Sequence, residues 1–120
     1  INTSVTCLDL SGAAITDGIV TKLSEALKVN SAIARLCLAS NQIGVEGVFA
    51  LVDILGPDNA RLAWLDLGRN PLTDNALSLL APKLADDNTL TALCLNETGL
   101  TQVCAADFNR LLKGSVTWIL

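Results

Sequence analysis

A repeating apolar pattern constrains this chain more than any other feature of its sequence. The five equivalent starting positions, separated by 28, 29, 28 and 26 residues, are Val5, Ile33, Leu62, Leu90 and Val116. The position three residues later holds Leu8, Leu36, Leu65, Leu93 and Ile119, and the position five residues later holds Leu10, Leu38, Leu67 and Leu95. Self-similarity at such a period predicts a solenoid, in which each unit buries its apolar side only against its neighbours.

Each unit is predicted to contain one strand followed by one helix, because its hydrophobic period changes partway through. In Leu65-Asp66-Leu67 the apolar residues alternate, which indicates a strand with one buried face. From Leu77 through Leu80 to Leu84 the spacing becomes three to four residues, which indicates an amphipathic helix. Stacking these units predicts an α/β slab of five parallel strands and four helices.

Several residues indicate where the helices begin and end. Thr16-Asp17, Thr73-Asp74 and Thr101 precede the helical stripes, where a hydroxyl can accept from free amides and an acid favours the helix dipole. Gly56-Pro57 is expected to end the second helix. Pro82 lies inside the third helix and removes one hydrogen bond, so we expect a kink or a late start there.

Two segments carry a recognisable motif. Residues 33–43 read Ile-Ala-Arg-Leu-Cys-Leu-Ala-Ser-Asn-Gln-Ile, and residues 62–72 read Leu-Ala-Trp-Leu-Asp-Leu-Gly-Arg-Asn-Pro-Leu. Both resemble the L-x-x-L-x-L-x-x-N-x-L pattern of leucine-rich repeat proteins, and the repeat length with a helical second half is similar to the ribonuclease-inhibitor-like subclass. The likeness covers residues 2–120.

This resemblance implies a leucine-rich-repeat solenoid with a curved parallel sheet on the concave side and helices on the convex side. It also implies that Asn41 and Asn70 hydrogen-bond to loop backbone. Ala13 and Thr98 replace this asparagine in the first and fourth units, so the outer turns are expected to be less regular.

We expect one domain over residues 1–120, with about four repeats and the first strand of a fifth. Neither end shows a unit with the polar outer face of a solenoid cap, which favours a piece of a longer repeat protein over a short protein with irregular caps. Both terminal strands should then present unpaired backbone and apolar surface. This predicts self-association through the ends.

Composition excludes several function classes. Eight basic and twelve acidic residues give a formal net charge of -4 with no basic stripe, which disfavours nucleic acid. No apolar run approaches the ~20 residues of a membrane span. The chain has no histidine and no C-x-x-C pair, which disfavours Cys-His or Ser-His-Asp catalysis and a structural zinc site. We therefore expect no enzymatic activity, no cofactor and no metal.

The strand pattern places three rows of side chains on the concave face. The first row is Cys7, Arg35, Trp64, Ala92 and Trp118; the second is Asp9, Cys37, Asp66, Cys94 and Leu120; the third is Ser11, Ala39, Gly68 and Asn96. Cys37 and Cys94 would stand two strands or roughly 10 Å apart, too far for a disulfide. Cys104 is expected to be a small core residue. A metal bridging the second row is the less favoured alternative to a polar surface.

Free thiols favour a reducing, cytoplasmic location. Two glycosylation sequons, at Asn2 and Asn96, indicate secretion instead, and chance matches are common in a repeat rich in threonine and asparagine. We therefore expect a cytoplasmic protein.

The candidate binding residues lie on this concave face. Trp64 is the expected anchor, with Arg35 beside it for a cation–π contact and Trp118 two strands away. Alternatively, neighbours shield Trp64 and Trp118 packs on an adjacent unit. The other expected contact residues are Asp9, Asp66, Asn96 and Ser11.

These residues predict a scaffold that binds a protein partner, not nucleic acid or membrane. The resemblance leaves two alternatives open: a GTPase-activating regulator, with Arg35 and Arg69 as the available arginines, and an architectural segment of a larger receptor or an actin-capping protein.

Overall fold

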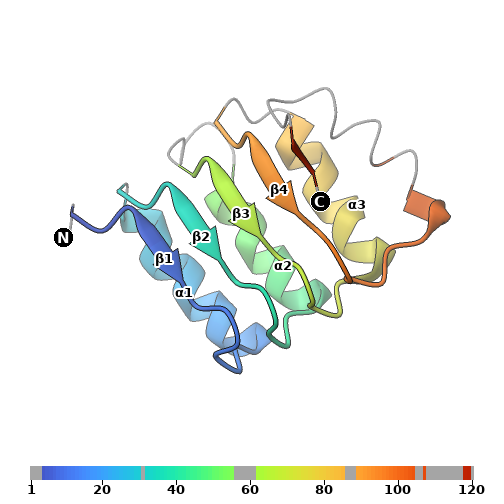
Figure 1. Ribbon diagram of the computed structural model, residues 1–120, viewed down its shortest axis with the longest axis horizontal. Helices are drawn as coiled ribbons and strands as arrows, with labels where there is room; N and C mark the ends of the chain where they lie inside the picture. Colours follow the sequence, from blue (N-terminus) through green and yellow to red (C-terminus); the bar gives the residue numbers. More distant parts are fainter. Residues whose placement is uncertain are drawn as a thin grey trace.

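A computed structural model of the chain shows a stack of strand–helix units (Figure 1). The structure describes residues 4–30, 32–55, 62–85, 89–104, 107 and 118–119. One parallel sheet runs in chain order through β1 (Cys7–Asp9), β2 (Arg35–Cys37), β3 (Trp64–Asp66), β4 (Ala92–Cys94) and β5 (Trp118–Ile119). The prediction of five parallel strands is confirmed.

The helices lie together behind one face of the sheet, as Figure 1 shows. They are α1 (Asp17–Val29), α2 (Val45–Leu51) with its 3-10 continuation η1 (Val52–Ile54), α3 (Thr73–Ala85) and the 3-10 turn η3 (Gln102–Cys104). Most of the fourth predicted helix and the Gly56-Pro57 stop lie outside the described residues. In the part of the chain that is described, no helix is long and apolar enough to span a membrane.

The register of the sheet follows the sequence repeat. Leu36 pairs with Leu65 and Leu65 with Leu93, and all three side chains are fully buried between the sheet and the helices. The apolar faces of the helices pack in the same core through Leu51, Leu80 and Leu84, which are also buried. Because each such leucine contributes about 1.5–3 kcal/mol through burial, the stacked leucines are the main source of stability.

The side of the stack beyond β1 and α1 is open in the described structure. Val5 is 42% exposed, whereas its equivalent Ile33 is 7% exposed. Ile19 is 46% exposed, whereas its equivalent Ala76 is fully buried. These apolar side chains are exposed because no described unit packs on this side of β1 and α1.

The turns after the strands share one backbone feature. The residue seven positions after each repeat start has a left-handed conformation, with φ of 64° at Gly12, 58° at Ser40, 54° at Arg69 and 55° at Glu97. Such a turn reverses the chain between strand and helix within a few residues. It also leaves carbonyls and amides of the loop pointing inward, where a polar side chain must satisfy them.

The buried asparagines supply those hydrogen bonds, as the resemblance implied. Asn41 Nδ2 donates to the carbonyls of Leu10, Leu38 and Ala39, at 3.0, 2.9 and 3.2 Å, and Oδ1 accepts from the amides of Ala13 and Ile15. Asn70 makes four of these five contacts one unit later, with Leu38, Leu67, Gly68 and Ile43. Thr98 keeps a single bond, from its hydroxyl to Leu95 O at 2.7 Å. Each asparagine therefore joins its own turn to that of the preceding unit.

The expectations about the helix starts are confirmed in part: Asp17 and Asp74 lie in the first turns of their helices, and the Thr101 hydroxyl accepts from the Val103 amide at 3.2 Å. Thr16 makes no side-chain cap hydrogen bond; the adjacent Asp17 instead accepts from the amide of Gly44 in the next unit, at 2.7 Å. Asp74 likewise accepts from the Thr101 amide at 2.8 Å, so these acids join neighbouring units. Of the kink and the late start that were the two alternatives for Pro82, the late start is absent, because α3 begins at Thr73 and continues past the proline.

Candidate protein-binding face

The centre of the concave face is a stacked pair of side chains from neighbouring strands. Arg35 of β2 and Trp64 of β3 are register partners, and the guanidinium carbon of Arg35 lies 4.8 Å from the centroid of the Trp64 ring. Arg35 is exposed and Trp64 is half-buried. A cation–π contact at such a site contributes about 0.5–1 kcal/mol, which holds both long side chains ready for a partner.

The remainder of the first row flanks this pair. Cys7 is exposed on one side, and Ala92 is half-buried on the other. Trp118 is the register partner of Ala92 in β5, which confirms its predicted place in the row. Its side chain lies outside the described structure. The small Ala92 therefore follows Trp64 directly, on the side away from Arg35.

The two carboxylates of the second row are held by their own turns. Asp9 Oδ1 accepts from the hydroxyl and the amide of Ser11, at 2.6 and 2.9 Å, and Asp66 Oδ1 accepts from the amide of Gly68 at 2.9 Å. The hydroxyl of Ser11, followed by its amide, lowers the pKa of Asp9 because both stabilise the ionised form. Both acids are thus fixed at the ends of their strands, and Ser11 is used to hold one of them.

The cysteines of the second row are less accessible than expected. Cys37 is half-buried, and Cys94 is only 7% exposed, so the expectation of an open Cys94 thiol is wrong. The Cys94 Sγ lies 2.8 Å from Asn96 Oδ1, which stands over it from the following turn. Burial raises the pKa of both thiols. Cys7, Cys37 and Cys94 are free thiols, and the Cys104 side chain lies outside the described structure.

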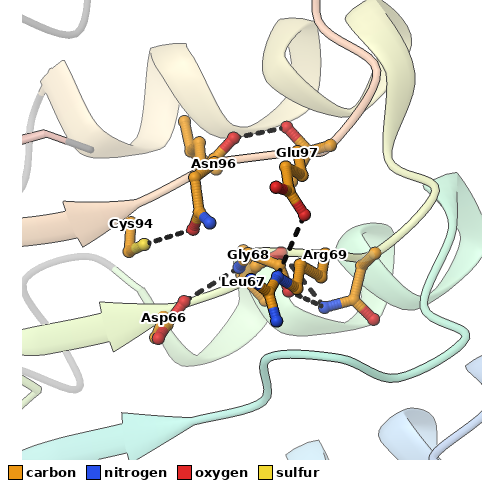
Figure 2. A network of polar contacts seen from close by, with 10 residues as sticks. Asp66, Leu67, Gly68, Arg69, Cys94, Asn96 and Glu97 are labelled. Atoms are coloured by element: carbon orange, nitrogen blue, oxygen red, sulfur yellow. Dashed lines mark hydrogen bonds and ion pairs between the residues drawn. The ribbon is translucent and has the colours of Figure 1, made fainter.

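Beyond β3 and β4 the turns form a polar rim (Figure 2). Arg69 and Glu97, the left-handed residues of neighbouring turns, form a salt bridge with 2.9 Å between Nε and Oε2. The Asn96 amide group covers Gly68, and a Cβ on Gly68 would collide with Asn96 Oδ1. Glu97 was not among the residues predicted from the sequence, although it lies seven residues after its repeat start, as Arg69 does.

The predicted contact residues thus form a band and not a cluster. Arg35, Trp64 and Asp66 are adjacent, whereas Asp9 on β1 and Asn96 after β4 are three strands, or roughly 14 Å, apart. Among the residues that the structure describes, no three acidic, cysteine or histidine side chains converge in a way that could hold a metal ion. The face can therefore make many separate contacts with an extended surface.

Comparison with known sequences identifies the repeat. A family profile described as "Leucine Rich repeat" matches residues 2–24 and 33–52. Two mouse (Mus musculus) proteins are similar over part of the chain. "NACHT, LRR and PYD domains-containing protein 5" is 37% identical over 73 residues, and "NACHT, LRR and PYD domains-containing protein 14" is 34% identical over 79 residues.

These alignments cover 61% and 66% of this chain but 6% and 8% of the two relatives, so the chain spans a small part of their length. Among solved structures, "Leiomodin-1 Actin-Binding Site 2 (ABS2)" superimposes with a TM-score of 0.88. That alignment covers 98% of this chain and 70% of the other, at 20% sequence identity. At this identity the likeness concerns the fold, which is the same curved stack of strands and helices.

Proposed function

Since the chain is a leucine-rich repeat protein, we propose that it is a scaffold which recognises a protein partner on its concave face, with no catalytic step. The stacked Arg35 and Trp64 are the observation that carries this proposal. Tryptophan and arginine are the residues most enriched at binding hot spots. Here they are already oriented, at 4.8 Å from guanidinium carbon to ring centroid, so less side-chain entropy is lost on binding.

Fixed charges around this pair give the face its selectivity. Asp9 and Asp66 are held by their turns, and Asp66 is adjacent to Trp64. A partner that places an apolar group on Trp64 and donors opposite these carboxylates fits best. Trp118 extends the first row, and Asn96 can donate through its amide at the rim. We assign the chain to the ribonuclease-inhibitor-like subclass, which the repeat length and the helices α1, α2 and α3 of the first three units support.

A comparison of two variants with the wild-type protein tests the binding role. Quantitative affinity purification should identify a partner, and titration calorimetry with that purified partner should then compare wild type, Trp64→Ala and Lys83→Ala. Truncating a hot-spot tryptophan costs about 2 kcal/mol, so Trp64→Ala should weaken binding by about 30-fold. Lys83 is exposed on α3, away from the concave face, so Lys83→Ala is the control. Equal affinity of all three proteins would contradict the proposal.

Actin is a second candidate partner because the similar solved structure is named as an actin-binding site. Cosedimentation with filamentous actin, again with Trp64→Ala beside wild type, separates this case from another protein partner. A GTPase-activating role is less well supported. Arg35 is stacked on Trp64 and Arg69 is paired with Glu97, so neither of these arginines is poised to reach a nucleotide. A GTP-hydrolysis assay with candidate GTPases tests it.

A further inference from the structure

A second surface lies on the helical side of the molecule, opposite the concave face. A hollow of about 390 Å³ runs along the outer surface between α1 and α2. Asp17, Gly18 and Thr21 line it from α1, Glu46 and Phe49 from α2, and Asp53 from η1. Helix α2 is much shorter than α1 and continues as a 3-10 turn.

Phe49 is the unusual residue of this hollow. Its side chain is 64% exposed. The equivalent residues of the neighbouring units are Thr21 and Ser78, whose hydroxyls donate to the carbonyls of Asp17 and Asp74, at 3.0 and 3.3 Å. The repeat therefore folds with a small polar residue here and does not need an aromatic one. An exposed phenyl ring in this place is available for burial by a partner.

All the charged residues that line the hollow around Phe49 are acidic. Asp17 is fixed there because its Oδ1 accepts from the Gly44 amide at 2.7 Å. Asp53 already attracts one cation, since its Oδ2 lies 3.3 Å from Lys28 Nζ. Glu46 has no hydrogen-bond or salt-bridge partner among the described residues. An anionic membrane or a nucleic acid would be repelled here, whereas a cationic protein segment would be attracted.

We propose that the hollow between α1 and α2 is a second docking site, which binds a basic segment of a protein partner. An aliphatic side chain of that segment packs on Phe49, and flanking lysine or arginine side chains lie against Glu46 and Asp17. This site goes beyond the proposed function because it uses the opposite side of the molecule. The chain could therefore hold one protein on each side.

A defined peptide tests the site without knowledge of the natural partner. The probe is an acetylated and amidated peptide of sequence Gly-Lys-Arg-Leu-Lys-Gly, with a matched peptide in which glutamate replaces each basic residue. Titration of the basic peptide into isotopically labelled protein should shift the amide NMR signals of Gly18, Thr21 and Ala50, which all line the hollow, and the acidic peptide should not. The Trp64 indole signal should not move. Acetylation of the peptide lysines and added salt should both weaken binding.

Two variants and one control assign the interaction to named side chains. Phe49→Ser places a small hydroxyl residue here, as in the neighbouring units. It should lower the affinity for the basic peptide by about tenfold or more. Glu46→Gln should weaken it by about two- to fivefold, since an exposed charge pair contributes little. Val103→Ser removes another exposed apolar side chain, 79% exposed on η3, and should leave affinity unchanged. All three positions are exposed, so thermal melting should show intact folds.

Several outcomes would overturn the proposal. One is equal binding of Phe49→Ser and wild type, and another is equal binding of the acidic and basic peptides. Shifts confined to the concave face would assign the peptide to the other surface. If Phe49→Ser instead lowered the mass of the protein in light scattering, the hollow would be a contact between copies of this chain.

Discussion

Replacing Asn70 with alanine removes four hydrogen bonds from the buried turn that follows β3. Its Nδ2 donates to the carbonyls of Leu38, Leu67 and Gly68, at 2.9, 3.0 and 3.1 Å, and its Oδ1 accepts from the Ile43 amide at 3.1 Å. The bonds are not equivalent, because some of these groups have a second partner. The loss of stability caused by the substitution depends on which of these groups lose their only hydrogen-bond partner.

Two of the four groups keep a partner. Leu38 O still accepts from Asn41 Nδ2 at 2.9 Å, and Gly68 O still accepts from the Ser40 amide at 2.9 Å. Leu67 O and the Ile43 amide have no other partner among the described residues, and both residues are fully buried. Each orphaned buried group costs about 1–3 kcal/mol, so Asn70→Ala should cost about 4 kcal/mol.

Two further variants test this accounting. Asn70→Thr should cost about half as much, because a hydroxyl can donate to Leu67 O as Thr98 does to Leu95 O at 2.7 Å. Asn41→Ala should cost about 1–3 kcal/mol. Of the groups that it orphans, only the Ile15 amide belongs to a buried residue; Leu10 is half-buried and Ala13 exposed, so water can reach them.

Urea denaturation followed by far-UV circular dichroism measures all three variants. The expected order of destabilisation is Asn70→Ala, then Asn70→Thr and Asn41→Ala close together. A loss below about 1 kcal/mol for Asn70→Ala would refute the reasoning, because it would mean that water or the backbone replaces the missing bonds. Equal losses for Asn70→Ala and Asn70→Thr would refute the role assigned to Leu67 O.

Two other predictions concern the thiols and the open edge. A disulfide reagent at mildly alkaline pH should modify exposed Cys7 first, Cys37 more slowly and Cys94 last, because burial raises the pKa of the latter two and limits access. All cysteines should alkylate in denaturant without reduction, and a disulfide found by mass spectrometry would contradict the expected cytoplasmic location. Light scattering should show self-association that rises with concentration, and Ile19→Lys at the open edge should reduce it. A monomer at all concentrations would show that this edge does not pair.

Much of the concave face was predictable because strand geometry is periodic. Once Leu36, Leu65 and Leu93 are assigned inward, the residues on either side of each must point outward. The repeat period supplies the alignment between strands, so Arg35 and Trp64 could be paired before any contact was known. The binding role of these residues stays a prediction, since neither the period nor the contacts identify a partner.

Accessibility within that face was not predictable, as Cys94 illustrates. Its row and register were assigned correctly, but Asn96 and the neighbouring strand cover it. The same limit applies to the helix starts. Thr16 is a residue type typical of a helix N-cap, but its side chain makes no cap hydrogen bond. The adjacent Asp17 instead accepts a hydrogen bond from the Gly44 amide of the next unit. The local sequence does not show how the next unit will be placed. It therefore cannot distinguish an N-cap hydrogen bond within one unit from a hydrogen bond between two units.

The sequence by itself determined the repeat, the alternation of strand and helix, the register of the sheet and the identity of its two faces. These features follow from the hydrophobic periodicity, which is about two residues in strands and three to four in helices, and which recurs in every repeat. The tertiary structure decided which polar groups are satisfied, which thiols are covered and where Phe49 is left exposed beside carboxylates. Those properties depend on distances between side chains of different units, which are set only when the units stack.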